Sequence, residues 1–202
     1  AYPIAIAISL IYLVLYVILG VTGVLFYLET DAEPIGSISS WCERVTAGIF
    51  RENANALSNL GFMVAGLLMF RKLTNDEATN SSKNNFTSLN KLSVLYAGAA
   101  IYLGPGSMLM HGTHTEWGGW ADNLSMVMYI LFPWLYNLKE MGRWSSNKFL
   151  QVYFSIVIVY AVARWFFGGR LGIGLDLFGL SIGLWVISET LYRFWSPVFR
   201  WS

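Results

Sequence analysis

Three residues near the middle of the chain have types and spacing that suit hydrolytic chemistry. Ser107 and His111 are four positions apart and therefore share one face of a helix. Asp122 begins the next apolar stretch after a short loop, so the two stretches should form an antiparallel hairpin with their polar ends together. A carboxylate beside an imidazole can orient a metal-bound histidine or take a proton from a metal-bound water. A histidine near a membrane surface is also often only a hydrogen-bonded residue, and both interpretations stay open.

A second polar group opens an earlier apolar stretch. Glu52, Asn55 and Asn59 follow a spacing of three to four residues, which places them on one helix face. A carboxylate is common where a helix begins, so capping alone accounts for Glu52. Asn55, Ser58 and Asn59 lie further inside and are candidates for polar contacts that support the site or pack helices. His114, three positions after His111, is a candidate of the same kind.

The composition indicates what kind of scaffold must hold these residues. Of the 202 residues, 55% are hydrophobic and 12% are charged, whereas about 25% are charged in a soluble domain. So much apolar surface predicts an integral membrane protein whose spans are helices of about 20 residues. Six stretches are apolar enough, at about 2–28, 54–71, 93–111, 121–138, 149–167 and 172–192. The predicted fold class is all-α, a polytopic transmembrane helix bundle.

The charges of the connections predict the orientation of the spans. Lys and Arg gather in 72–92, in 139–148 and in the C-terminal tail, whereas 29–53 is acidic. By the positive-inside rule both ends of the chain are predicted to be cytoplasmic, and a bacterial inner membrane is the favoured host. The polar stretch 73–90 is predicted to be a flexible linker. The basic residues form no stripe, so no nucleic-acid partner is predicted. The single cysteine, Cys42, excludes an intramolecular disulfide.

Taken together, the motifs resemble those of the alkaline ceramidases, which belong to a membrane hydrolase superfamily that includes the adiponectin-receptor-like proteins. Ser107-x3-His111 followed by Asp122 is similar to the Ser/His/Asp signature of that family. A second set of matches lies in the acidic segment that enters the family's first core helix: Trp41-Cys42-Glu43 and Glu52-x2-Asn55-x2-Ser58-Asn59. The resemblance covers about residues 41–138 through motifs and the remainder through hydropathy.

The resemblance implies a seven-helix bundle that holds a catalytic zinc and hydrolyses the amide bond of ceramides. By resemblance, His111 is a zinc ligand, Asp122 orients or deprotonates the metal-bound water, and Ser107 helps to hold the oxyanion. This agrees with zinc chemistry, because the metal lowers the pKa of a bound water to about 7 and polarises a carbonyl.

The family also holds a calcium ion in its acidic segment. The matching positions here are Glu43, Glu52 and the backbone carbonyl of Trp41. Arg44 and Val45 stand where the family tends to place further oxygen ligands. The cofactors implied by the resemblance are therefore zinc and calcium.

The chain departs from the family at the zinc ligands. The family takes two of them from an His-x3-His pair in its last helix, whereas this sequence has two histidines in all, His111 and His114. With two predicted spans after the Asp122 helix, we expect a ceramidase-like core that is C-terminally incomplete. We also expect an extra N-terminal transmembrane helix at 1–28, ahead of a ceramidase-like domain at 29–202.

Two functions from different classes follow. The leading interpretation is a ceramidase-like, zinc-dependent amide hydrolase whose lipid substrate enters from the bilayer. The alternative is a non-catalytic accessory or structural subunit of a larger membrane complex, which contacts other membrane subunits and keeps part of the site. A haem or chlorophyll ligand at His111 or His114 has no support from the spacing, and a transporter would need paired broken helices.

Overall fold

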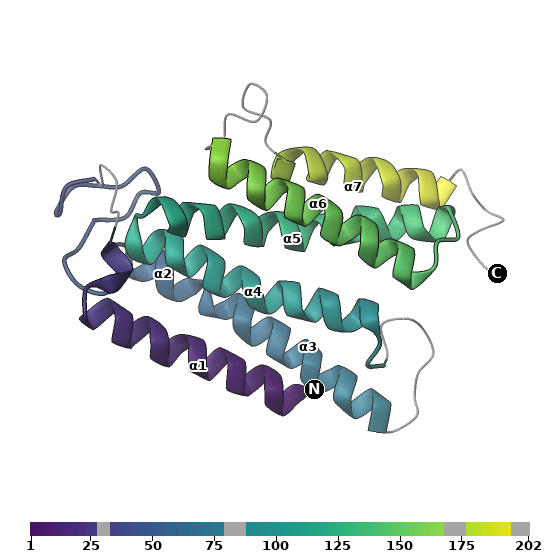
Figure 1. The fold of residues 1–202 in the computed structure, drawn as a ribbon, viewed down its shortest axis with the longest axis horizontal. Coiled ribbons are helices and arrows are strands. Elements are labelled where there is room, and N and C mark those ends of the chain that lie inside the picture. Colours follow the sequence, from purple (N-terminus) through teal and green to yellow (C-terminus); the bar gives the residue numbers. More distant parts are fainter. Residues whose placement is uncertain (28–32, 79–87, 168–176, 195–202) are drawn as a thin grey trace. The chain divides into compact units, whose positions relative to one another are not determined.

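The computed structural model of the protein describes residues 1–27, 33–78, 88–167 and 177–194, and helices make up most of them (Figure 1). In chain order they are α1 (Tyr2–Val21), the short 3-10 helix η1 (Val24–Phe26), α2 (Asn53–Ser58), α3 (Leu60–Ala78), α4 (Lys91–Thr113), α5 (Glu116–Met141), α6 (Ser146–Phe167) and α7 (Leu177–Phe194). Since α2 and α3 continue one another through Asn59, these helices correspond to the six predicted stretches. The described residues contain no strand, only one bridge between Ile38 and Arg44. The all-α fold class is confirmed.

Four helical segments are long and apolar enough to cross a membrane: α1, α2 with α3, α4 and α6. α1 exposes large apolar side chains along its length, including Ile4, Ile8 and Ile18. Water would solvate such a surface poorly, whereas lipid chains match it. The assignment of α5 and α7 as spans stays a prediction.

The predicted end of the first helix was wrong. α1 ends at Val21 rather than near residue 28. The hydroxyl of Thr22 donates to the carbonyls of Ile18 and Leu19, and Gly23 follows in a left-handed conformation with φ of 79°. A glycine in this conformation ends a helix at little cost, and apolar composition alone does not reveal that turn. Residues 28–32 lie outside the described residues.

The predicted start of the polar linker was also wrong. α3 continues through residues 73–78 of the stretch assigned to the linker. Leu73 and Asp76 are buried on the inner side of these turns, and Lys72 forms an ion pair with Asp76 one turn away. Packing of this face keeps the helix intact where the polar composition predicted none.

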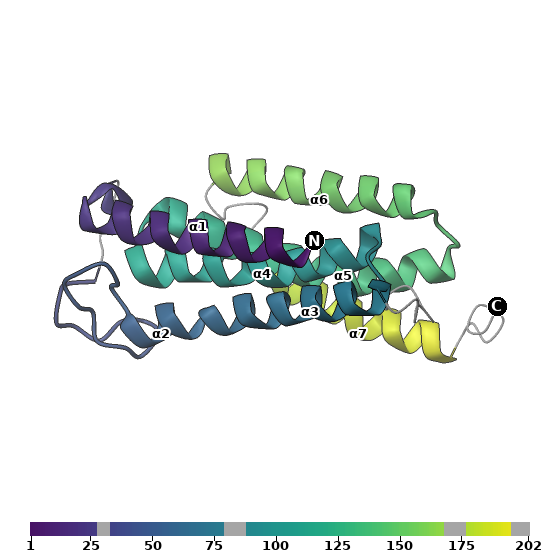
Figure 2. The ribbon, with the colours of Figure 1, turned by 90° about the horizontal axis from the view of Figure 1, so that it is seen from below.

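The chain divides into two compact units, Ala1–Ser125 and Met126–Ser202, with the boundary inside α5. In the first unit α3 packs along both α1 and α4. The segment 33–52 lies at the end of this unit where α1 ends and α2 begins (Figure 2). The C-terminal end of α4 reaches the same place, because Arg51 N–H donates to Gly112 O at 2.9 Å.

The predicted hairpin between α4 and α5 is confirmed within the first unit. The connection is only two residues long, with His114 in a left-handed conformation at φ of 52°. Behind it the two helices lie very close, because a Cβ added at Gly106 would come within 2.5 Å of the Ser125 side chain. This close approach brings the C-terminal half of α4 against the first turns of α5.

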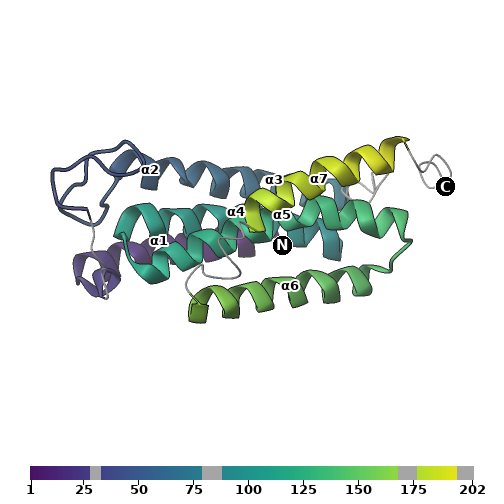
Figure 3. The same cartoon turned by 90° about the horizontal axis from the view of Figure 1, so that it is seen from above.

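The second unit holds the rest of α5 together with α6 and α7 (Figure 3). The Tyr153 hydroxyl of α6 donates to the Met128 carbonyl of α5 at 2.6 Å. On α5, the Asn137 side chain donates to Ser188 Oγ at 3.2 Å and to Glu189 Oε2 at 2.9 Å on α7. Side-chain hydrogen bonds between helices are a common means of association inside membranes.

Candidate active site

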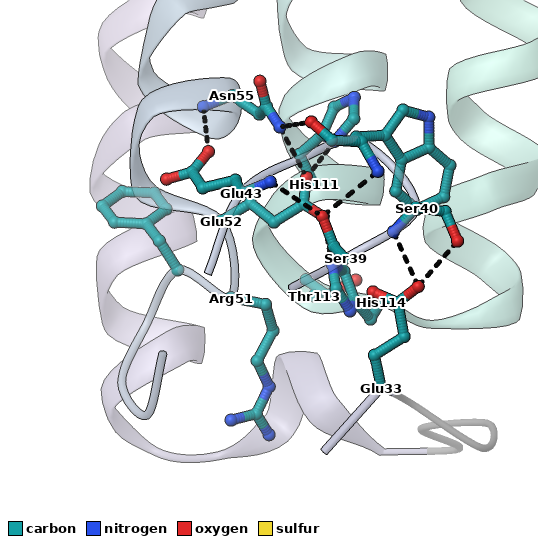
Figure 4. A network of polar contacts seen from close by, with 12 residues as sticks. Glu33, Ser39, Ser40, Glu43, Arg51, Glu52, Asn55, His111, Thr113 and His114 are labelled. Atoms are coloured by element: carbon teal, nitrogen blue, oxygen red, sulfur yellow. Dashed lines mark hydrogen bonds and ion pairs between the residues drawn. The ribbon is translucent and has the colours of Figure 1, made fainter. Parts of the chain in front are cut away.

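A buried carboxylate lies between the two histidines. Glu52, the residue before α2, has no exposed surface. Its Oε2 atom is 2.5 Å from Nδ1 of His111, and its Oε1 atom is 3.2 Å from Nε2 of His114 (Figure 4). The first contact is a hydrogen bond, whereas the second has the distance of an ion pair without hydrogen-bond alignment. The chain therefore brings one carboxylate and two imidazoles together from segments 59 positions apart.

The backbone around Glu52 is fixed to the end of α4. Glu52 N–H donates to His111 O at 3.0 Å and Arg51 N–H donates to Gly112 O at 2.9 Å. The last carbonyls of a helix have no partner within the helix, so these two bonds satisfy both segments at once. The left-handed turn at His114 brings the second imidazole back toward the same carboxylate.

The surroundings of Glu52 favour its charged form. Burial would raise the pKa of the carboxyl, but hydrogen bonds from the side chains of Ser39, Asn55 and His111 hold the pKa below its usual value. A charged carboxylate accepts hydrogen bonds, so Nδ1 of His111 carries the proton in this contact. That leaves Nε2 of His111 as the nitrogen free to act on a metal or a reacting group.

The acidic segment is folded around Asn55. Both carboxylate oxygens of Glu43 accept hydrogen bonds from the start of α2, from Ala54 N at 2.7 Å and Asn55 N at 2.8 Å. The Asn55 side-chain amide donates to Glu52 Oε2 at 3.0 Å and to Trp41 O at 3.4 Å. The three positions predicted from the resemblance to supply calcium ligands thus all contact one asparagine, and calcium binding by them stays a prediction.

The indole of Trp41 covers the two imidazoles. Its ring centroid lies 5.2 Å from that of His111, at an interplanar angle of 85°, and 6.2 Å from that of His114. The hydroxyl of Ser39 accepts hydrogen bonds from Trp41 N and Glu43 N and so holds this part of the loop. Trp41 itself is 47% exposed, so the indole that lies against both imidazoles stays partly open to the surroundings.

The predicted Ser/His/Asp group also comes together. The carboxyl of Asp122 on α5 is hydrogen-bonded to the Ser107 side chain of α4 and lies within the electrostatic influence of His111. The Asp122 Oδ1 atom is buried and accepts no hydrogen bond from the residues that the structure describes. A buried carboxylate oxygen without a donor is unfavourable unless another group completes it. It is therefore the atom of this group best placed to receive a proton or a donor from a bound molecule.

The other predicted polar residues, Ser58 and Asn59, form hydrogen bonds within their own helical segment. Ser58 Oγ and Asn59 Nδ2 both donate to Asn55 O, at 2.9 Å and 2.8 Å. These bonds lie where α2 passes into α3. Ser58 and Asn59 therefore stabilise the helix that follows Glu52.

Sequence reasoning missed the partner of His111. It assigned Glu52 to a calcium site or a helix cap, whereas the structure pairs Glu52 with both histidines. One signal was present in the sequence, because Glu52 directly precedes an apolar helix and a carboxylate there has to find a partner. The spacing of residues along the sequence did not indicate which side chain would be the partner of Glu52.

The residues of this site do not make a complete zinc centre. A catalytic zinc takes three protein ligands and keeps one open position. Within the described ranges, no three His, Cys, Asp or Glu side chains are arranged to hold a metal ion. The sequence has two histidines in all, and Nδ1 of one of them is engaged by Glu52.

Comparison with known proteins agrees with the motifs. A family model described as Ceramidase matches residues 33–195, which begin at the acidic segment and run into α7. Neither the curated proteins nor the solved structures gave a match. The matched range contains Glu52, Ser107, His111 and Asp122 and covers well over half of the chain. The chain therefore belongs to the ceramidase family and is a ceramidase-like membrane hydrolase.

Proposed function

We propose that this protein hydrolyses the amide bond of a ceramide-type lipid, with Ser107, His111 and Asp122 at the reacting end of the substrate. The observation that carries the proposal is the hydrogen bond between the Asp122 carboxyl and Ser107, close enough to His111 for the two charges to interact. All three residues lie within the range matched by the family. The buried Oδ1 atom of Asp122, which lacks a donor within the described residues, supports a role in accepting a proton.

In the proposed reaction, Asp122 takes a proton from the attacking water while the water oxygen bonds to the amide carbon. The Ser107 hydroxyl donates a hydrogen bond to the carbonyl oxygen as negative charge develops there. Asp122 then returns the proton to the amide nitrogen, the carbon–nitrogen bond breaks, and a fatty acid and an amine leave. Glu52 orients His111 by accepting its Nδ1 proton, which is the usual task of a carboxylate beside a ligating histidine.

For zinc, we propose only one ligand among the described residues, His111. Nε2 of His111 is the nitrogen that would hold the metal, and zinc supplies a polarised carbonyl and an acidified water when bound. Because the described residues do not complete a ligand set, none of the steps above depends on the metal. Calcium in the acidic segment, at Glu43, Glu52 and the Trp41 carbonyl, is proposed from the resemblance alone.

Exchange of lipid with the bilayer fits the surface of the protein. The first unit exposes apolar side chains along α1 and α3, among them Val14, Phe62 and Leu68. A lipid of low water solubility reaches such a protein through the membrane more readily than through water. We propose that the substrate approaches the site from the hydrocarbon layer.

The alternative function is a non-catalytic subunit of a larger membrane complex. One observation favours it: both carboxylate oxygens of Glu52 already lie against an imidazole, as in a purely structural polar cluster. Under this alternative the cluster only fixes α2 against α4, and other membrane subunits are the partners.

Ceramide cleavage by the purified protein tests the proposal. The protein is incubated in detergent micelles with ceramide, with and without added zinc, and the released sphingoid base is quantified beside the zinc content. We expect release by the wild type and a loss of about 100-fold or more in Asp122→Asn, since general base catalysis contributes about 100- to 10,000-fold.

Asp76→Asn is the matched control, because Asp76 is another mostly buried aspartate on a helix of the same unit and pairs with Lys72 instead. It should keep the wild-type rate. Absence of release by the folded, zinc-supplied wild type would contradict the hydrolase, and equal rates in Asp122→Asn and the wild type would remove Asp122 from the reaction.

A further inference from the structure

The N-terminal helix α1 lies outside the residues matched by the family, yet it contacts the frame of the candidate site. The match begins at residue 33, whereas α1 ends at Val21. Most of its large side chains are exposed and apolar, but Tyr16 is only 2% exposed. A buried tyrosine on an otherwise lipid-like helix needs a partner for its hydroxyl, and that partner indicates what α1 does.

Tyr16 holds the segment that carries Glu52. Its hydroxyl donates to Ile49 O at 2.9 Å, and its ring stacks on Phe50 with centroids 5.3 Å apart and an interplanar angle of 16°. Two residues later, Arg51 N–H and Glu52 N–H bond to the carbonyls at the end of α4. The segment from Ile49 to Glu52 is thus attached to α1 on one side and to α4 on the other.

The same hydroxyl also touches α4 directly, at the residue after His111. A Cβ added at Gly112 would overlap the Tyr16 hydroxyl and lie 3.1 Å from Cζ of its ring. Only glycine leaves room for the phenol at this position. Further along α1, the Tyr12 hydroxyl donates to Pro105 O at 3.2 Å, two residues before Ser107.

We propose that α1 is a positioning element for the site and that Tyr16 is the residue through which it acts. The 2.5 Å contact between Glu52 and His111 requires the backbone of Glu52 to keep a fixed position relative to the end of α4. The hydroxyl of Tyr16 donates a hydrogen bond to Ile49 O, three residues before Glu52, and so holds this backbone in that position. Without it the segment loses its attachment to α1, and the Glu52 carboxylate no longer has one fixed approach to the imidazole.

The close approach of Tyr16 to Gly112 can be tested with a double-mutant cycle. Gly112→Ala should displace the Tyr16 ring and lower both the thermal midpoint and the fraction of folded protein. Tyr16→Phe removes the overlapping oxygen, and the remaining 3.1 Å contact to the ring can be relieved by a small shift. The double variant Tyr16→Phe/Gly112→Ala should therefore recover stability relative to Gly112→Ala alone. Additive losses in the double variant would overturn the proposed contact.

A readout at the imidazole separates positioning from simple stabilisation. The chain has two histidines, so 15N-histidine labelling gives two sets of imidazole signals, which a His114→Gln variant assigns. Tyr16→Phe should shift the Nδ1 signal of His111. Tyr153→Phe is the matched control, because it also removes a buried hydrogen bond from tyrosine to a backbone carbonyl, at Met128 in the second unit.

The control should lower the thermal midpoint by a similar few degrees and leave the His111 signal unchanged. An unchanged His111 signal in Tyr16→Phe would overturn the proposal. The kinetic arm depends on the proposed function: Tyr16→Phe should lower kcat about 10-fold at constant KM, because small misplacements of reacting groups cost up to about 100-fold. If the wild type cleaves no ceramide, the proposed hydrolase function is contradicted. The His111 imidazole signal still tests whether Tyr16 positions Glu52.

Discussion

Nδ1 of His111 lies 2.5 Å from Oε2 of Glu52, although the two residues are 59 positions apart and belong to different helical segments of the first unit. This pair joins the acidic segment to the helix that carries Ser107. It fixes which imidazole nitrogen is engaged and which is left for chemistry. The stability and the chemistry of the site both depend on it.

The charge of Glu52 should make stability depend on pH. Its pKa is held below the usual value in the folded protein, so the folded state favours the charged form. The resulting stabilisation is complete above the unfolded pKa of about 4.3 and is lost as the pH falls through the folded value. Glu52→Gln, which leaves buried partners incompletely satisfied, should cost about 1–3 kcal/mol at neutral pH.

Thermal unfolding in detergent between pH 3.5 and 7 measures this effect. The gap between the wild type and Glu52→Gln should narrow as the pH falls below about 4.3. Glu33→Gln is the control, because the Glu33 carboxylate accepts its hydrogen bonds from Ser40 in the same segment (Figure 4). A gap that does not narrow below that pH would show that Glu52 is not charged in the folded protein.

The two histidines should differ in their effect on activity. His111 contacts Glu52 through a hydrogen bond and interacts with Asp122, whereas His114 faces Glu52 without hydrogen-bond alignment. Because Nε2 of His111 is the nitrogen proposed to hold the metal, His111→Gln should abolish bound zinc and lower kcat/KM by about 10- to 100-fold. His114→Gln should keep most of both. Elemental analysis and ceramide turnover measure the two effects, and equal losses in both variants would contradict the assignment of the acting nitrogen to His111.

The sequence was sufficient to predict the helices and the hairpin that brings Ser107 and Asp122 together. Both follow from local properties, because the apolar stretches fix the spans and a short connection fixes the antiparallel pairing. The structure shortens that connection to two residues, since α4 runs to Thr113 and α5 begins at Glu116. The structure adds the physical detail at Gly106, where the absence of a side chain permits the close contact with Ser125. Positions along the sequence are therefore enough to predict which residues of two helices joined by a short connection lie close together.

The pairing of Glu52 with His111 was beyond the same reasoning. It depends on how the segment before α2 crosses the end of α4, which is set by two backbone hydrogen bonds and by Tyr16 of α1. Backbone bonds between distant segments leave no trace in residue types. The helix end at Val21 was missed for a related reason, since a left-handed Gly23 is one residue in an otherwise apolar stretch.

The contact at Gly106 should be essential for the Ser107–Asp122 relationship. Gly106→Ala would place a methyl group within 2.5 Å of Ser125 and 2.8 Å of Ala121 O, and overpacking of this kind costs about 1–3 kcal/mol. It should also move Ser107 relative to Asp122 and reduce turnover. Gly98→Ala is the matched control on the same helix, because nothing lies within 4 Å of its added Cβ.

Thermal midpoint and turnover are measured for both glycine variants. Gly98→Ala should stabilise the protein slightly, by up to about 1 kcal/mol, since alanine favours a helix over glycine. Its turnover should match the wild type. If Gly106→Ala also keeps full stability and turnover, the close approach of α4 and α5 at this point is not needed for the site.

Glu43 should combine two roles that can be separated by calcium. Both its oxygens cap the first turn of α2, so Glu43→Gln should cost about 1 kcal/mol with or without calcium, as loss of a helix cap does. If calcium binds among Glu43, Glu52 and the Trp41 carbonyl, adding it raises the thermal midpoint of the wild type, because a ligand of the folded state stabilises that state. The rise should disappear in Glu43→Gln and persist in Glu33→Gln. A calcium-dependent rise of equal size in Glu43→Gln would leave Glu43 as a cap alone, since a true ligand cannot be replaced without weakening the ion's binding.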